Sequence, residues 1–173
     1  STAMWQAAFR GELGVCRFLW EHGAAGTIRT MDNGGRTPML VACWNGWLDV
    51  AEWLFAVGAA VDIRTQDSYG RTPMYLACCN DHLDVAKWLF TVGAAEDIRT
   101  MNLRGWTPMY AACWSGHLGV AKWLFEVGAA KDIRGKNSGG RTPMLAACQD
   151  GHLDVIKWLF EVGAAEDIRT KDN

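Results

Sequence analysis

The chain has 173 residues, of which 50% are hydrophobic and 21% are charged, and its formal net charge is −2 at pH 7. This charge lacks the basic excess that is typical of proteins bound to nucleic acid or to an anionic membrane surface. No uninterrupted apolar run approaches the ~18 residues that indicate a membrane-spanning helix. We therefore expect no nucleic-acid partner and no membrane insertion.

A segment of 35 residues recurs along the chain. The motif Thr-Pro-Met begins at four equally spaced threonines, namely Thr37, Thr72, Thr107 and Thr142. A fixed period of this size predicts an array of stacked supersecondary units rather than one globular core. Residues 1–34 fit the period with fewer matches, as expected of a unit that covers the end of a stack. We expect one continuous solenoid domain of five units, with a divergent N-terminal capping repeat at 1–34 and repeats at 35–69, 70–104, 105–139 and 140–173.

Each full unit begins with the start signals of a short helix. In the second unit, Thr37 supplies a hydroxyl N-cap, and Pro38 takes the first helical position, where its missing N–H does no harm. Apolar residues then follow Met39 at spacings that place them on one helix face. The pair Asn45-Gly46 is expected to end this helix.

A second helix is predicted in each unit, followed by a long loop. In the second unit this helix runs from about Leu48 to Val57, and Gly58 ends it as a left-handed cap. Residues 62–65 alternate polar and apolar, and residues 67–70 have turn composition. The unit is thus helix, turn, helix and a hairpin-shaped polar loop, and the predicted fold class is all-α.

Two residue types recur at fixed places and predict packing between units. Tryptophan occupies one place in the second helix of each full unit, at Trp53, Trp88, Trp123 and Trp158, and Phe18 takes this place in the first unit. We expect this column to pack, because aromatic side chains bury large areas. Cysteine recurs in the first helix, at Cys43, Cys78, Cys113 and Cys148. Equivalent residues of stacked helices lie about 8–10 Å apart, beyond disulfide reach, so we interpret them as buried free thiols in a reducing, cytoplasmic compartment.

The repeated residues resemble the ankyrin repeat. They read Gly-Arg-Thr-Pro-Met, then Ala-Cys, then Gly-His-Leu-Asp-Val-Ala-Lys-Trp-Leu-Phe and Gly-Ala-Ala, strongly over residues 35–173 and weakly over 1–34. The period exceeds the usual ankyrin length by two residues, best placed between Ala59 and Asp62. The resemblance implies an ankyrin-repeat solenoid that binds another protein on a concave face formed by loop tips and first helices.

No catalytic or metal-binding constellation is present in the sequence. His82, His117 and His152 occur one per unit and cannot converge on one ion at ~2 Å; the resemblance implies that they bond loop backbone. Arginine also recurs at one place in each unit, and four of these five arginines, such as Arg64 and Arg99, have an aspartate two residues earlier. We interpret these pairs as a solvated, locally balanced ladder of ion pairs. We expect no enzyme activity, no cofactor and no metal.

Candidate binding residues are those that differ between otherwise repeated units. They fall in the loop before each Thr-Pro and on the first helix, and units three and four hold most of the Tyr, Trp and Arg among them. These residue types are enriched at interface hot spots. We interpret these positions as solvent-facing, because core residues should recur in every unit. The predicted partner-binding residues are Trp44, Tyr69, Arg71, Tyr75, Leu103, Arg104, Trp106, Tyr110 and Trp114.

An alternative function is open at this point. The fifth unit lacks the polar outer face of a terminal cap, so we expect a segment of a longer array. Such a segment is a structural spacer or scaffold with no specific partner of its own, and its uncapped C-terminal repeat would favour self-association.

Overall fold

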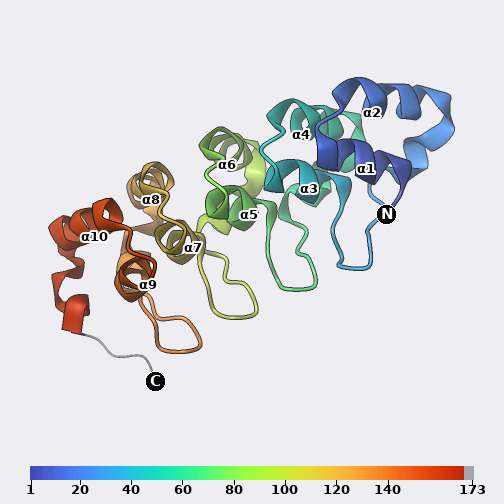
Figure 1. Cartoon of the computed structure of the whole chain (residues 1–173). Coiled ribbons are helices and arrows are strands. Elements are labelled where there is room, and N and C mark those ends of the chain that lie inside the picture. The colour runs from blue at the N-terminus through green and yellow to red at the C-terminus, as the bar shows by residue number, and fades with distance from the viewer. Residues whose placement is uncertain (170–173) are drawn as a thin grey trace.

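The structure is a computed structural model that describes residues 1–169, so the last four residues of the predicted fifth unit lie outside the described residues. About five helix–turn–helix units are stacked side by side, and this confirms the predicted all-α solenoid. Figure 1 shows two rows of helices, with the first helix of each unit lying between the second helices and a set of loops that project to one side. The exact unit boundaries stay a prediction.

The first helices begin and end close to where the sequence predicts. They are α1 (Ala3–Arg10), α3 (Pro38–Trp44), α5 (Pro73–Cys79), α7 (Pro108–Trp114) and α9 (Pro143–Gln149). The threonine before each helix caps it: the Thr37 hydroxyl accepts a hydrogen bond from the Leu40 backbone N–H at 3.2 Å, and the Thr107 hydroxyl accepts one from Tyr110 at 3.1 Å.

Each second helix has a regular α-helical part that is followed by a π-helical turn. The regular parts are α2 (Leu13–Leu19), α4 (Leu48–Leu54), α6 (Leu83–Leu89), α8 (Leu118–Leu124) and α10 (Leu153–Leu159). A π-helical turn continues each one, over Trp20–Ala24, Phe55–Ala59, Phe90–Ala94, Phe125–Ala129 and Phe160–Ala164. Gly58 has a φ of 118° inside such a turn, so the helix ends there as predicted.

The segment after each helix pair differs from the sequence prediction. Short 3-10 helices lie at Ala25–Thr27, Ala60–Arg64, Ala95–Arg99, Ala130–Arg134 and Ala165–Arg169. The alternation at residues 62–65 was interpreted as part of the hairpin-shaped loop, and that interpretation is wrong. The 3-10 helix lets Ile63 and Asp62 both point inward, because its three-residue turn does not separate neighbours as a strand does.

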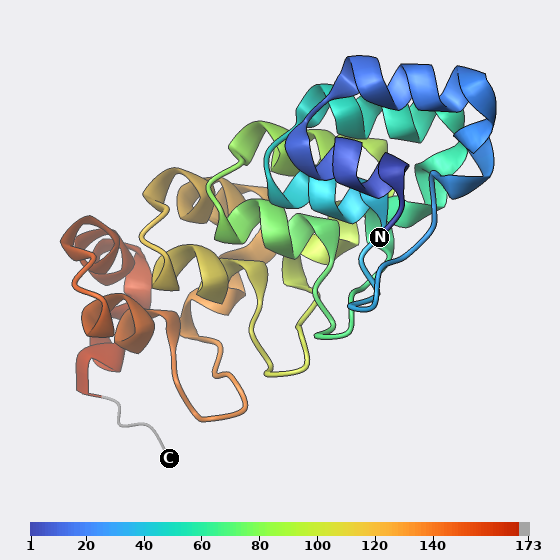
Figure 2. The same ribbon diagram turned by 45° about the vertical axis from the view of Figure 1, so that its right-hand side comes forward.

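The loop tips are bonded to one another through their backbones. Within the loop that leads into the third unit (the third loop), the Asp67 N–H donates to the Arg71 carbonyl at 3.1 Å, which closes the tip as a hairpin. Between loops, the Ser68 N–H donates to the Gly34 carbonyl at 2.9 Å, and the Leu103 N–H donates to the Tyr69 carbonyl at 3.0 Å. In Figure 2 these loops lie in a row beneath the first helices.

The tryptophan column packs between units, as predicted. Each of the later tryptophans meets the phenylalanine of the preceding unit edge-on, as in Phe125–Trp158, where the ring centroids are 5.8 Å apart. Trp20 takes the place of that phenylalanine in the first unit and contacts Trp53. Phe18, at the equivalent place of the first unit, is 58% exposed, so the packing expected of this column does not extend to it.

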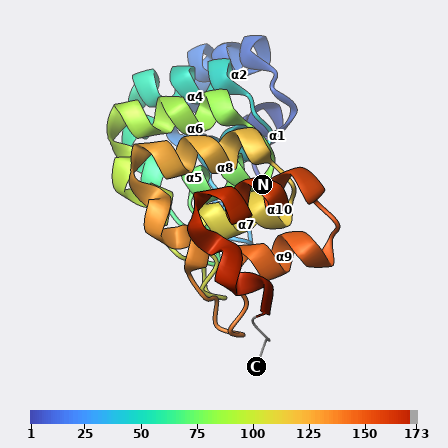
Figure 3. The ribbon, with the colours of Figure 1, turned by 90° about the vertical axis from the view of Figure 1, so that its left-hand side faces the viewer.

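The cysteine column is buried wherever a unit follows. Cys43, Cys78 and Cys113 are buried and free, and burial raises the pKa of each thiol. Cys148 is exposed, which corrects the expectation for the fifth unit. Figure 3 looks onto this C-terminal unit, where α9 and α10 face the viewer. Its side chains on that face have no following unit against which to pack within residues 1–169.

The arginine–aspartate pairs join successive units. Arg64 contacts Asp97 at 3.1 Å, and Arg99 contacts Asp132 at 2.8 Å, so each arginine pairs with the aspartate of the next unit. The expectation of solvated pairs within one unit is therefore wrong. The aspartates are buried, and only the arginines reach solvent. Among the described residues, no helix has the length and apolar character needed to cross a membrane.

Candidate functional site

The loop tips and the first helices together form one side of the stack, which we call the loop-side face. It comprises residues 28–37, 65–72, 100–107 and 135–142 and helices α1, α3, α5, α7 and α9. Threonine caps fix where each helix leaves its loop, and the loop tips are bonded in a row. Side chains on this face are therefore held at defined spacings by a regular backbone.

A pocket of about 280 Å³ lies on this face between the third and fourth units. Loop and helix residues of both units line it. Its lining residues are Tyr69, Arg71, Tyr75, Cys79, Asn102, Leu103, Arg104, Trp106 and Trp114. Seven of the nine predicted binding residues are thus brought together, and Trp44 and Tyr110 are the two outside the lining.

Arginines and aromatic rings alternate along the N-terminal part of the face. The guanidinium carbon of Arg36 lies 5.4 Å from the Trp5 ring centroid and 5.5 Å from that of Trp44. Arg71 continues the row, 5.5 Å from Trp44 and 5.0 Å from Tyr69. These are cation–π distances, so Trp44 is joined to the pocket through Arg71.

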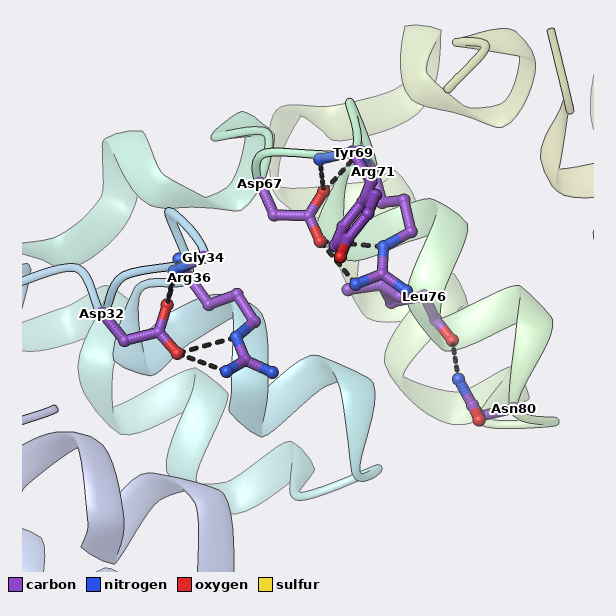
Figure 4. A network of polar contacts seen from close by, with 8 residues as sticks. All are labelled: Asp32, Gly34, Arg36, Asp67, Tyr69, Arg71, Leu76 and Asn80. Atoms are coloured by element: carbon purple, nitrogen blue, oxygen red, sulfur yellow. Dashed lines mark hydrogen bonds and ion pairs between the residues drawn. The ribbon is translucent and has the colours of Figure 1, made fainter. Parts of the chain in front are cut away.

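Aspartates at the loop tips hold two of these arginines in place. The Asp67 carboxylate accepts hydrogen bonds from the backbone N–H groups of Tyr69 and Arg71, both at 2.9 Å, and one from the Arg71 side chain at 2.8 Å. Asp32 makes the same set of contacts with Gly34 and Arg36 one loop earlier. Figure 4 shows both carboxylates facing their guanidinium groups, with the Tyr69 ring beside Arg71. Both guanidinium charges are neutralised within their own loops.

Aromatic rings form a cluster on the fourth unit. The Trp106 ring centroid lies 5.1 Å from that of Tyr110 and 5.2 Å from that of Trp114. Trp106 comes from the loop and the other two come from α7, so the cluster fills the corner between loop and helix. Leu103 extends from the loop tip beside this cluster and is 75% exposed.

Two tyrosines lie deeper than the sequence predicted. Tyr75 and Tyr110 are 3% and 4% exposed, so their interpretation as solvent-facing residues is wrong. Burial raises the pKa of both hydroxyls. Trp106 packs against Tyr110, and Tyr75 is one of the residues that line the pocket. Both residues support the exposed side chains around the pocket.

Two lining residues were not among the predicted ones. Cys79 is partly buried, and its thiol pKa is raised by burial, which disfavours the reactive thiolate. Asn102 stands where the second and third loops carry Asp32 and Asp67. Both residues differ from their equivalents in some of the other units, so the comparison that selected the other binding residues could also have identified these two.

At the recurring histidine place, His117 and the tryptophan of the second unit bond to the backbone. His117 donates a hydrogen bond from Nε2 to the Cys79 carbonyl at 3.0 Å, and Trp47 uses its indole N–H in the same way toward the Phe9 carbonyl. Both bonds run to the first helix of the preceding unit. Among residues 1–169, no three His, Cys, Asp or Glu side chains gather closely enough to hold a metal ion.

Comparison with known proteins agrees with this architecture. A family model described as ankyrin repeats (3 copies) matches residues 1–67, 57–134 and 94–172. A search of curated proteins finds no significant match. The matched segments together cover nearly the whole chain, and the stacked helix pairs have the arrangement that the family model implies. The chain belongs to the ankyrin repeat family.

Proposed function

We propose that the chain is a non-catalytic protein-interaction module whose partner binds the loop-side face over the third and fourth units. Ankyrin repeats are in general protein–protein interaction modules without catalytic activity. The observation that carries the proposal is the pocket at the corner of loop and helix, where the irregular Tyr, Trp and Arg residues gather on an otherwise repeated scaffold.

The exposed residues around the pocket have the character of an interface. Tyr69 is 61% exposed and Leu103 is 75% exposed, and both line the pocket. Neighbouring exposed apolar side chains next to a preformed hollow are typical of docking surfaces. A uniform spacer would present the same polar residues in every loop. The free thiols support a reducing compartment, and we place the module in the cytoplasm.

The test compares two double variants in capture from a cell lysate. Tyr69→Ala with Leu103→Ala removes the exposed side chains at the pocket. Val15→Ala with Val61→Ala removes two exposed apolar side chains that do not line the pocket and serves as the matched control. Both variants should keep the thermal unfolding midpoint of the native chain. Proteins captured by the native chain and by the control should be lost from the pocket variant, and equal capture by all three would refute the proposal.

Exposed apolar residues on the C-terminal face favour a second role, as part of an extended array of repeats. Leu153, Phe160 and Ile168 are exposed there, at places where the inner units pack against a neighbour. This face would stack on a further repeat or on another copy of the chain. Sedimentation at increasing protein concentration tests it, and a monomer at all concentrations would speak against self-association.

A further inference from the structure

The fourth loop, which leads into the fourth unit, differs in its charges from the loops before it. In the second and third loops, an aspartate and the arginine four residues later neutralise each other, as Asp67 and Arg71 do at 2.7 Å. In the fourth loop, Asn102 replaces the aspartate and Trp106 replaces the arginine. An additional arginine, Arg104, stands at the tip where the third loop has Tyr69.

Asn102 keeps the loop shape but removes the charge. Its side-chain oxygen accepts hydrogen bonds from the backbone N–H groups of Arg104 and Trp106 at 2.9 and 3.0 Å, as the Asp67 carboxylate does in its own loop. An amide carries no negative charge and cannot form an ion pair with a guanidinium. The backbone is therefore unchanged, while the carboxylate that would neutralise an arginine is absent from this tip.

Arg104 has no carboxylate partner among the described residues. Its side chain is exposed and lies over the Trp106 ring, 5.7 Å from the centroid. The ring holds the guanidinium near the pocket without neutralising it. Arg71 is the other charged group in the lining, and Asp67 already pairs with it. The lining contains no acidic side chain, so the pocket carries one uncompensated positive charge at its rim.

The size of the pocket limits what it can accept. Its volume of about 280 Å³ lies below the ~300–1,000 Å³ of typical small-molecule sites and suits one large side chain. Tyr69, Leu103, Trp106 and Trp114 supply apolar walls. A side chain that fills this hollow brings its own neighbours in sequence close to Arg104.

We propose that the partner presents a protein segment in which a large apolar side chain lies next to an aspartate or glutamate. The apolar side chain occupies the pocket, and the carboxylate pairs with Arg104 at its rim. This inference rests on the proposed function, because it assigns the chemistry of the partner to the same face. Charge complementarity and the pocket volume are the two observations that select an acidic, apolar segment.

The experiment selects binders from a random peptide library displayed on phage, with the full chain as target. Enriched peptides should share a large apolar residue beside Asp or Glu. One enriched peptide is then titrated against Arg104→Gln and against Lys87→Gln, which removes one exposed positive charge on α6 and is the matched control. We expect Arg104→Gln to weaken binding about fivefold, the scale of an ion pair at an exposed rim, and Lys87→Gln to leave it unchanged. Selection on Arg104→Glu should enrich lysine or arginine instead.

The possible results separate the inference from the proposed function. Enriched peptides without acidic residues, equal affinity for native chain and Arg104→Gln, or a library that yields no enriched motif would each overturn the inference. Peptides that bind independently of Arg104 but are lost with Tyr69→Ala and Leu103→Ala would overturn it while supporting the proposed face. Peptides that bind this double variant with native affinity would overturn the proposed face as well.

Discussion

The two members of each inter-unit ion pair are unequally exposed. The Arg99 side chain is 52% exposed, whereas that of its partner Asp132 is 7% exposed. Arg99 donates three hydrogen bonds to the two carboxylate oxygens, at 2.8 to 3.2 Å. If the aspartate is removed, water can solvate the exposed arginine. If the arginine is removed, little water can reach the buried aspartate. The two groups are therefore not equivalent for stability.

Removing the arginine should destabilise the chain more than removing the carboxylate charge. Arg99→Met leaves the Asp132 carboxylate buried without its donors, and we expect a loss of about 2–3 kcal/mol in the free energy of unfolding. Asp132→Asn leaves a guanidinium that water solvates, and we expect a loss of about 1 kcal/mol. Urea denaturation of both variants measures the difference. The reverse order would show that the aspartate is well hydrated in the folded chain.

Two aspartates should give opposite pH dependence. Burial raises the pKa of Asp62 above its ordinary value of 3.8, although Arg29 opposes this. Burial also raises the pKa of Asp32, but hydrogen bonds from Arg36 and from the Gly34 backbone outweigh it, and the net pKa is lowered. The stabilising contribution of Asp62 is thus full below pH 3.8 and is lost as pH rises through its raised pKa. That of Asp32 is full above 3.8 and is lost as pH falls through its lowered pKa.

These signs can be measured with two asparagine variants. Thermal unfolding of the native chain, Asp62→Asn and Asp32→Asn is followed from about pH 7 to about pH 3. As pH falls, the native chain should gain stability relative to Asp62→Asn and lose it relative to Asp32→Asn. Parallel pH profiles for the two variants would contradict the assigned directions.

At the scale of the element, the turn between the two helices of a unit uses a left-handed residue. Glycine takes this place at Gly46, Gly116 and Gly151, but the third unit has Asp81, with a φ of 64°. A side chain in this conformation is strained. The nearest compensating group is His117, whose Nδ1 lies 3.9 Å from an Asp81 carboxylate oxygen, and the carboxylate is largely exposed. Such a contact is weak.

Asp81→Gly should therefore stabilise the chain. We expect a gain of about 0.5–1 kcal/mol in the free energy of unfolding, because the strain is removed and little attraction is lost. The reciprocal variant Gly46→Asp should destabilise it, since a Cβ at this site would collide with the His82 ring. Chemical denaturation measures both changes. A less stable Asp81→Gly variant would mean that the contact with His117 outweighs the backbone strain.

The helices were the most predictable elements of the sequence. The signals at Thr37, Pro38 and Gly58 act through local backbone chemistry, which can be read from residue type alone. The structure has the helix cap and the helix ends at these residues. The 3-10 helices were missed because four residues are too few to distinguish a period of two from a tight helical turn. The partner of each arginine was missed for another reason: stacking brings Arg64 closer to Asp97 than to the nearby Asp62, and no sequence spacing shows this.

For the molecule as a whole, each unit contacts mainly its neighbours, so equivalent residues have unequal roles at the middle and at the end. Phe125 meets Trp158 edge-on, whereas the equivalent Phe160 is 54% exposed. Stability in such arrays is approximately a sum over units and nearest-neighbour interfaces. The same substitution should thus have different effects at the two places.

Phe125→Ala and Phe160→Ala form a matched pair for this idea. We expect Phe125→Ala to lower the free energy of unfolding by about 2–3 kcal/mol, because it removes the packing against Trp158. Phe160→Ala should change it by less than about 0.5 kcal/mol, as is usual at an exposed position. Denaturation of both variants at low protein concentration gives the comparison. Equal losses would indicate that the C-terminal face is covered in solution.

Comparison of the units selected most residues of the pocket but did not show how deeply they lie. Seven of the nine predicted binding residues line one pocket, because the repeat places equivalent loops and helices side by side. However, a position whose residue differs between units is not necessarily exposed to solvent. Leu40 and Tyr75 occupy equivalent, buried places, since a core of this kind accepts side chains of different shape where the neighbouring unit also differs.

The hydrogen bonds that link successive loop tips also concern how the chain recognises other molecules. The Ser138 N–H donates to the Arg104 carbonyl at 3.1 Å, and the earlier loop tips are bonded to their neighbours in the same way. One loop tip therefore cannot move without disturbing the next. A surface that is already rigid loses little conformational entropy when it is covered. Ligands whose shape matches this surface are therefore favoured over ligands that would require it to change conformation. Selectivity then arises from shape complementarity rather than from conformational adaptation.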